Sequence, residues 1–243
     1  MNRTASLART ALLCSTLVLL FAACSGGDAT SSNAGPNMLD APAADTTAPG
    51  AAPLIPADAP TVVFLGDSIG AGLHLAEHQA FPAVLQARLA ADGLPFRLVN
   101  ASESGRTTSG GVTALDWVMR TEPDLVVIEL GGNDGLRGIE LATVEKNLRR
   151  MIEIAREGGA DVLLLGVRLP LNYGDYGADF DAIYPRVAEG LEVAFEPSFM
   201  RDVGGVPTMN LADGLHPTAA GHERLADNVR LSLRDALRAA IAD

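Results

Sequence analysis

Thr61-Val62-Val63-Phe64-Leu65-Gly66-Asp67-Ser68 is a short run of β-branched and apolar residues that ends in a turn carrying a serine. A continuous apolar run closed by a glycine is typical of a strand buried on both faces of a parallel sheet. Similar runs occupy residues 96–100, 124–130 and 161–167, and helical apolar spacing falls at 81–91, 141–156 and 218–241. This alternation predicts a three-layer α/β/α fold with a central, mostly parallel sheet.

Several polar or glycine residues follow the predicted strands within a few positions. Ser68, Gly105 and Asn133 come after the first three of them. Open parallel sheets carry reactive groups on the loops after the carboxyl ends of their strands. We therefore expect these loops to meet at one edge of the sheet, where the segment before the last helix adds Asp213 and His216.

The segment Asp213-Gly214-Leu215-His216 can serve a serine nucleophile. A serine attacks a carbonyl group when a base removes its proton, and an imidazole does this best when a carboxylate fixes its tautomer. One loop delivers both groups to Ser68. Residues 102–105 and 131–134 contain the backbone N–H groups and the amide that can stabilise negative charge on the carbonyl oxygen.

Gly66-Asp67-Ser68-Ile69-Gly70 also fits the GxSxG nucleophile elbow of the α/β-hydrolases. In that fold the serine lies in mid-chain after several strands, and the acid and the histidine come from separate loops. Here the serine follows the first strand, and the acid and the histidine are neighbours in the chain. The positions therefore argue against an elbow.

Four blocks, in order, resemble the SGNH or GDSL-type hydrolase family: Gly66-Asp67-Ser68-Ile69, Gly105, Gly131-Gly132-Asn133-Asp134 and Asp213-Gly214-Leu215-His216. The resemblance covers nearly the whole predicted domain and implies a flavodoxin-like fold. It implies Ser68 as nucleophile, His216 as general base and then acid, and Asp213 as the residue that orients the imidazole. The implied oxyanion hole consists of the backbone N–H groups of Ser68 and Gly105 and the side-chain amide of Asn133.

Two longer stretches, residues 127–138 and 168–174, look like the bacterial thioesterase I, lysophospholipase and arylesterase group of that family. Ile69 replaces the usual leucine, which conserves volume. Arg106 stands where this group often has an acidic residue, so the bracing of that loop and the charge of the entrance are expected to differ.

The chain begins with features of export. Arg3 and Arg9 precede an apolar run at 11–23, which is too short to span a bilayer comfortably and is typical of a signal peptide. Leu20-Phe21-Ala22-Ala23-Cys24 resembles the bacterial lipobox, so residues 1–24 are expected to be a lipoprotein-type signal peptide with lipidation at Cys24. The alternative is ordinary secretion. Either way, the protein is expected in the cell envelope or periplasm.

Residues 25–60 are rich in Ala, Pro, Ser and Thr and contain no basic residue. Such a segment cannot build a core, so it is expected to be a disordered tether with a root-mean-square span of ~30 Å. The hydrolase domain is assigned to residues 61–243, and it contains neither of the two cysteines. The formal net charge of −12 argues against nucleic acid or an anionic membrane face as a partner, which leaves a lipid anchor as the membrane contact.

These features together indicate a serine esterase for small-molecule or lipid esters, including thioesters, with an apolar acyl chain. No metal or cofactor is needed. The residues expected to line an acyl groove lie in or near the active-edge loops: Leu136, Ile139, Leu169, Leu171 and Tyr173. Ordinary core packing is the alternative for them. The alternative functions are a carbohydrate deacetylase of the same fold and a non-catalytic envelope binding module.

The remaining polar and aromatic residues of interest have less context. His74 and His78 could rim the cleft, and His222 is expected on the surface or in packing. Asp67 and Asp134 are expected to brace loops through backbone N–H groups. Trp117 and Met119 are expected to fill gaps in the core.

Overall fold

The computed structural model describes residues 55–242. The predicted signal peptide, Cys24 and most of the predicted tether lie outside the described residues. Residues 55–60 form no helix or strand and lead into the first strand. None of the helices in the described range is long and apolar enough to cross a membrane.

A single sheet of five parallel strands forms the centre of the domain, in the order β2-β1-β3-β4-β5. The strands are β1 (Thr61–Gly66), β2 (Arg97–Asn100), β3 (Leu125–Glu129), β4 (Asp161–Leu165) and β5 (Ala194–Glu196). The first four confirm the predicted strands. The fifth was missed because it is an edge strand of three residues, of which one is exposed, and it therefore has no apolar run.

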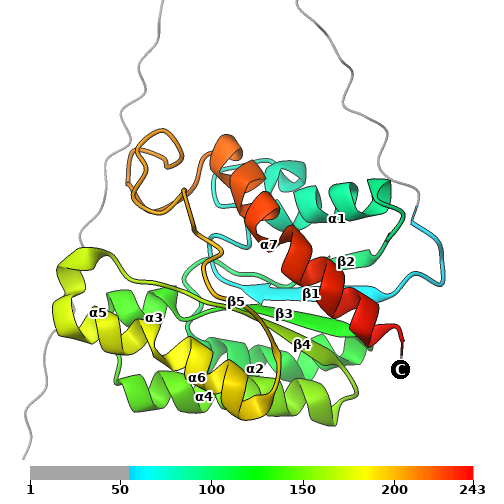
Figure 1. Ribbon diagram of the computed structural model, residues 1–243, viewed down its shortest axis with the longest axis horizontal. Helices are drawn as coiled ribbons and strands as arrows, with labels where there is room; N and C mark the ends of the chain where they lie inside the picture. The colour runs from blue at the N-terminus through cyan, green and yellow to red at the C-terminus, as the bar shows by residue number, and fades with distance from the viewer. Residues whose placement is uncertain (1–54, 243) are drawn as a thin grey trace, which may run out of the picture. The chain divides into compact units, whose positions relative to one another are not determined.

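Helices cover both faces of the sheet, which confirms the predicted three-layer fold (Figure 1). On one face α1 (Phe81–Ala91) packs against α7 (Ala219–Ala240). On the other face α4 (Leu141–Glu157) lies between α2 (Thr108–Val118) and α6 (Ile183–Leu191). The connections contain the short helices α3 (Gly132–Leu136) and α5 (Gly174–Asp181) and the 3-10 turns η1 (Glu77–Gln79), η2 (Met119–Thr121) and η3 (Leu171–Tyr173).

Local sequence explains where the main helices form. The buried face of α4 repeats every three or four residues, through Val144, Leu148, Met151, Ile152 and Ala155. Helix α7 begins at a proper N-cap, because the Thr218 hydroxyl accepts a hydrogen bond from the N–H of Gly221 at 3.2 Å. Helix α2 was not predicted, since two glycines in its first turns obscure the helical pattern.

The core surrounds the inner strands of the sheet, of which β1 and β3 are the most completely buried. Every residue of β1 and β3 is buried, which is why their sequences show no polar alternation. Met119 packs against this core. The prediction for Trp117 is wrong: its side chain lies on the outer side of α2 and is 46% exposed.

The order of the strands determines where a crevice forms at the carboxyl ends of the sheet. The chain leaves β1 toward β2 on one side and later enters β3 on the other, so the connections diverge after β1. In open α/β sheets this switch point leaves a crevice at the carboxyl ends of the strands. Ser68 follows β1 and Asn133 follows β3, so both lie at that crevice.

Candidate active site

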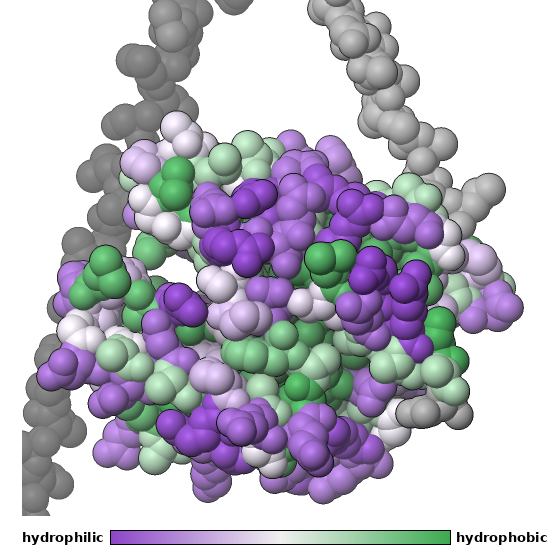
Figure 2. Space-filling model, viewed as in Figure 1, coloured by the Kyte–Doolittle hydropathy of each residue, from purple (hydrophilic) through white to green (hydrophobic). Residues whose placement is uncertain are grey.

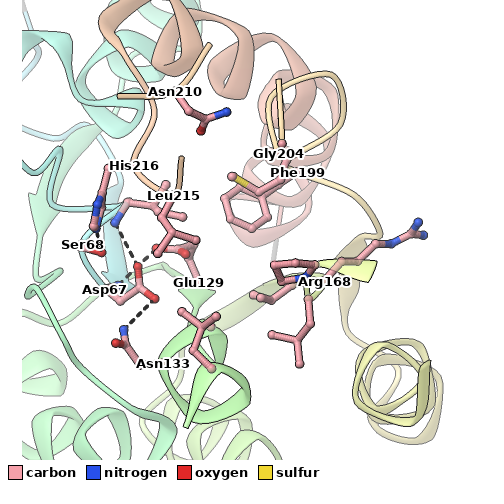
Figure 3. Close-up of a pocket in the computed structure, with 18 of the residues that line it drawn as sticks. Asp67, Ser68, Glu129, Asn133, Arg168, Phe199, Gly204, Asn210, Leu215 and His216 are labelled. Carbon is pink, nitrogen blue, oxygen red and sulfur yellow. Dashed lines mark hydrogen bonds between the residues drawn. The ribbon is translucent and has the colours of Figure 1, made fainter. Parts of the chain in front are cut away.

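Ser68 lies two residues beyond the end of β1 and points to the imidazole of His216 (Figure 3). The Ser68 hydroxyl oxygen is 2.9 Å from His216 Nε2. On the other side of the ring, Nδ1 is 2.7 Å from Asp213 Oδ2. Since the carboxylate fixes the proton on Nδ1, Nε2 is left to accept the proton of the serine.

The loop that carries Asp213 and His216 is held rigid by its own backbone. Asp213 Oδ1 accepts hydrogen bonds from the N–H groups of Leu215 at 2.9 Å and His216 at 3.0 Å. The base of the loop is closed by a bond from Leu211 N–H to the His216 carbonyl at 2.7 Å. The N–H of His216, its imidazole and the N–H of Leu215 hold the pKa of Asp213 well below its ordinary value. Asp213 is therefore ionised at any pH at which the protein works.

The side chain of Asn133 is fixed from two directions. It lies in the first turn of α3, and its Nδ2 donates to Asp67 Oδ2 at 3.2 Å. Its Oδ1 accepts from Arg137 Nη2 at 3.3 Å, and the same nitrogen donates to the Gly105 carbonyl at 3.3 Å. One arginine thus links the two groups expected, besides Ser68, in the oxyanion hole. An amide has two N–H bonds, so Asn133 keeps one for a ligand.

Gly105 has a backbone φ of +82°, a conformation that glycine adopts without strain. Arg106, the departure noted in the sequence, braces this loop from within. Its guanidinium donates to the Ala101 carbonyl and pairs with Glu103 at 2.7 Å, and its side chain is largely buried. Arg106 therefore contributes to loop rigidity rather than to the charge of the entrance.

Two buried carboxyl groups lie beneath the nucleophile. Asp67 Oδ1 accepts from the Ile69 N–H at 3.0 Å, which confirms its bracing role. Glu129 Oε2 accepts from the N–H groups of Asp67 at 3.2 Å and Gly70 at 3.1 Å. A side chain at Gly70 would collide with Glu129 and with Ser102. The glycines around Ser68 thus serve this close packing, which accounts for the chance match to GxSxG.

Burial shifts the ionisation of both carboxyl groups in the same direction. Burial raises the pKa of Asp67 from its ordinary 3.8 to about 6, although bonds from Ile69 and Asn133 oppose this. Burial and the neighbouring Asp67 hold the pKa of Glu129 well above 4.5. Both carboxyl groups therefore hold a proton more strongly than an exposed carboxyl group does, and burial is the main cause for each. Glu129 was missed as a site residue, although a lone carboxylate ending an apolar strand is a signal that could have found it.

A cavity of about 680 Å³ opens beside Ser68. Polar groups of Asp67, Ser68, Asn133 and His216 form one wall, and Figure 3 shows Phe199, Gly204 and Arg168 on the opposite side. The opposite wall consists of residues after β4 and β5: Gly166, Val167, Arg168, Leu169, Pro170, Leu171, Ser198, Phe199, Met200, Gly204 and Gly205. Most of these side chains are apolar, and the sequence predicted few of them.

Three of the five predicted groove residues, Leu136, Leu169 and Leu171, line this cavity. Ile139 and Tyr173 are not among its lining residues. Tyr173 instead donates its hydroxyl to the Leu136 carbonyl at 3.4 Å, and Tyr176 donates to the Ile139 carbonyl at 2.7 Å. Both tyrosines tie the segment after β4 to the end of α3.

The other predicted polar residues have distinct positions. The His74 ring lies nearly perpendicular to the His216 ring, at a centroid distance of 6.4 Å, and His74 has a positive φ of 69°. His78 is exposed and is not among the residues that line the cavity. His222 is buried, and its Nδ1 accepts from the Phe81 N–H at 3.0 Å, so it packs α7 against α1. Asp134 braces the start of α2 by accepting from the N–H and the hydroxyl of Thr108 at 2.8 and 2.7 Å.

Within residues 55–242, no three His, Cys, Asp or Glu side chains are grouped so that they could hold a metal ion. The chemistry of the site can instead be read from the hydrogen-bonded serine, imidazole and carboxylate beside the amide of Asn133. Such an arrangement can activate a hydroxyl group and stabilise an oxyanion.

Comparison with known proteins supports the same chemistry. The model of the "GDSL-like Lipase/Acylhydrolase family" matches residues 64–224. "Esterase TesA" of Pseudomonas aeruginosa is 48% identical over 74% of this chain and 91% of its own length. "Thioesterase 1/protease 1/lysophospholipase L1" of Escherichia coli K12 is 38% identical over 70% of this chain and 82% of its own. "Arylesterase" of Vibrio mimicus is 37% identical over 71% and 87%.

Solved structures match the fold over the same region. The crystal structure of TesA has a TM-score of 0.70 at 48% identity and covers 72% of this chain, while 99% of the TesA chain is matched. The psychrotrophic esterase EstA from Pseudoalteromonas sp., in a form inhibited by monoethylphosphonate, has a TM-score of 0.67 at 29% identity and covers 75% and 99%. The matched part of this chain thus corresponds to complete folded relatives.

Proposed function

This chain belongs to the GDSL-like lipase/acylhydrolase family and is a serine esterase of the SGNH type, and on that basis we propose that it acts through an acyl-enzyme formed on Ser68. The observation that carries the proposal is the unbroken hydrogen-bond chain from Ser68 through His216 to Asp213, with distances of 2.9 and 2.7 Å. A serine in that chain can lose its proton as it attacks.

In the first half of the reaction, the Ser68 oxygen bonds to the ester carbonyl carbon and its proton moves to His216 Nε2. The carbonyl π electrons move to the oxygen, which becomes an oxyanion. We assign its stabilisation to the N–H groups of Ser68 and Gly105 and to Asn133 Nδ2. When the oxyanion collapses, the C–O bond to the leaving alcohol breaks and His216 returns the proton to that alcohol.

In the second half, a water molecule attacks the acyl-enzyme. His216 removes a proton from the water, the second oxyanion forms in the same place, and the bond to Ser68 breaks as its oxygen regains the proton. Asp213 stays ionised throughout and stabilises the imidazolium. The rigid loop from Leu211 to His216 keeps the three groups aligned in both halves.

The shape and the lining of the cavity favour an apolar acyl chain. The wall opposite Ser68 contains Val167, Leu169, Phe199 and Met200, and it offers few hydrogen-bond partners for a sugar. A carbohydrate deacetylase is therefore the weaker candidate. The non-catalytic binding module is set aside, because the chain belongs to a family of ester-hydrolysing enzymes.

The substrate class also depends on location. We propose that residues 1–24 direct export, that Cys24 carries a lipid, and that residues 25–60 tether the hydrolase domain to the membrane of the cell envelope. Acyl-CoA is confined to the cytoplasm, so a thioesterase activity would not be the physiological one. Lysophospholipids and incoming esters are then the better candidates, and one relative carries the name lysophospholipase.

A series of p-nitrophenyl esters of increasing acyl length, together with lysophosphatidylcholine and an acetylated sugar, tests this proposal. The expected result is a rise in kcat/KM with chain length, turnover of the lysophospholipid and little release of acetate from the sugar. Equal kcat/KM for acetyl and long acyl esters would contradict the proposed acyl site. Preferred release of acetate from the sugar would support the deacetylase.

A further inference from the structure

Exposed apolar side chains gather at the mouth of the cavity. Of the six large apolar side chains that are exposed among the described residues, three line this cavity: Leu136, Leu171 and Leu215. Scattered exposed leucines are common on soluble proteins, but a cluster at one opening marks an interaction surface. The other three, Trp117, Leu231 and Ile241, are not among the cavity's lining residues.

Leu171 is the most exposed of the six, at 101% of its reference area. It begins the turn η3, which projects from the sheet between β4 and α5 (Figure 1). In Figure 2, apolar side chains form the tip of the lobe that contains α5, beside a hollow in the surface. Because Tyr173 bonds to the carbonyl of Leu136, the tip and the end of α3 are held together as one rim.

We infer that this rim of Leu136, Leu171 and Leu215 docks the active-site mouth onto the surface of a zwitterionic phospholipid layer. The inference rests on the proposed function, since it concerns how a membrane-borne ester reaches Ser68. The rim is continuous with the apolar wall of the cavity through Leu169 and Pro170. An acyl chain can therefore pass from the lipid layer to the serine without crossing water.

The position of the rim distinguishes a lipid layer from other occupants. A protein partner or a second copy of the chain seated on the three leucines would cover the opening beside Ser68 and His216. A lipid layer covers the same leucines and delivers the substrate. Insertion of such apolar side chains into the lipid layer stabilises membrane binding in proportion to the apolar area that is buried.

The charges around the mouth fit a zwitterionic layer better than an anionic one. Arg168, on the same loop as Leu171, is exposed, and its guanidinium is directed away from the cavity in Figure 3, so it can reach a lipid phosphate. The adjacent helix α5 carries Asp175, Asp179 and Asp181, which repel an anionic surface. The chain as a whole has a net charge of −12.

The predicted tether is long enough for this orientation. The chain enters β1 at the amino-terminal end of that strand, and the mouth of the cavity lies at the carboxyl end. A six-residue strand spans about 20 Å. The ~30 Å span expected for residues 25–60 exceeds that depth. A lipid on Cys24 therefore leaves the domain free to turn its mouth to the membrane.

Binding of residues 55–243 to phosphatidylcholine vesicles, measured by sedimentation, tests the inference. This part matches a complete crystallised relative over 99% of that relative's length, and it lacks Cys24, so an attached lipid cannot contribute. Ser68→Ala is included to prevent hydrolysis. We expect measurable binding that persists at high salt and is weaker on phosphatidylglycerol vesicles. Leu171→Ser should lower the partition coefficient roughly tenfold, which corresponds to about 1.4 kcal/mol.

Leu231→Ser is the matched control, because Leu231 is 60% exposed on α7 and does not line the cavity. It should leave the partition coefficient unchanged. Absence of binding by the parent, or equal loss in both leucine variants, would overturn the inference. A dimer in light scattering that Leu171→Ser alone dissociates would assign the rim to self-association instead. None of these binding measurements depends on turnover, so they fail or succeed separately from the proposed esterase activity.

Discussion

The two walls of the cavity are built in different ways. The catalytic wall is polar and follows β1, β3 and the loop before α7, and its side chains are fixed by hydrogen bonds to one another and to the backbone. The acyl wall follows β4 and β5, and its residues are held mainly by packing. Hydrogen bonds demand particular residue types at particular positions, whereas packing accepts many apolar combinations. One wall can therefore keep a fixed chemistry while the other sets the substrate.

The largest effect should come from removing the nucleophile. Ser68→Ala is expected to lower kcat by about 10⁴-fold or more, while the acyl wall still binds substrate. The Ser68 side chain makes one hydrogen bond among the described residues, to His216, so the melting temperature should change little. Stopped assays measure kcat, and calorimetric titration with a long-chain product acid measures binding to the acyl wall. Loss of product binding together with turnover would show that the two walls are not separable.

Asn133→Ala should have the next largest effect. Removing one oxyanion donor typically lowers kcat by about 10²- to 10³-fold, because the donor acts on charge that exists only in the transition state. KM should stay within a few-fold of the parent value. Steady-state kinetics on a short ester separates the two constants. A raised KM with an unchanged kcat would place Asn133 in ground-state binding instead.

A pH-dependent test concerns the support of the catalytic wall. His222 holds α7, which follows the catalytic loop, against α1. Burial lowers its pKa from 6.5 to about 4. The unfolded chain then binds a proton that the folded chain does not, so stability present above pH 6.5 is lost as the pH falls to 4, by about 3 kcal/mol.

Denaturant unfolding at several pH values between about 4 and 7 measures how the free energy of unfolding changes with pH. His222→Gln should remove this contribution, since the glutamine oxygen can still accept from Phe81 but does not titrate. An unchanged slope in the variant would mean that other groups cause the acid destabilisation.

The acyl wall can be altered without touching the catalytic wall. Gly204 lines the cavity without a positive φ, and an added Cβ would meet its nearest neighbour, in Met200, only at 3.7 Å. Gly204→Leu is therefore tolerated by the backbone and should fill part of the cavity. We expect kcat/KM for a long acyl ester to fall about tenfold, which is the scale of a lost methylene or two. The acetyl ester serves as the internal control, and an equal fall for both esters would contradict a separate acyl wall.

The smallest effect should come from Arg137, which is exposed and bonds the Gly105 carbonyl and the Asn133 oxygen at 3.3 Å each. Arg137→Met should lower kcat severalfold, since the donors are held less firmly, with little change in KM. Arg168→Met, an exposed arginine on the acyl wall, should leave kcat on the acetyl ester unchanged and is the matched control. Equal effects of the two changes would indicate a general charge effect.

The catalytic wall could largely be predicted from the sequence. Asp213 and His216 lie three residues apart, so their meeting is a local property, and Ser68 and Asn133 follow the two strands that are buried at every residue. The loops they occupy meet because parallel strands end at one edge. Hydrogen-bonding residues leave a readable pattern because few substitutions preserve their geometry.

The acyl wall could not be predicted to the same extent. Residues 198–205 follow β5, a strand too short to have a periodic pattern, and their place in the cavity depends on long-range packing. Tyr173 was expected to line the groove because it lies in or near an active-edge loop, yet its hydroxyl donates to the Leu136 carbonyl. Tertiary contacts decide which side of a loop faces a cavity, and the local sequence does not reveal those contacts.

The most direct test of the account is the identity of the acylated atom. The protein is mixed with a long-chain p-nitrophenyl ester, quenched in acid within the first turnover, digested and analysed by mass spectrometry. The account predicts one added acyl group on the peptide that contains Ser68, formed at the rate of the p-nitrophenol burst and absent in Ser68→Ala. Turnover by Ser68→Ala at the parent rate, or an acyl group on any other residue with the same kinetics, would contradict it.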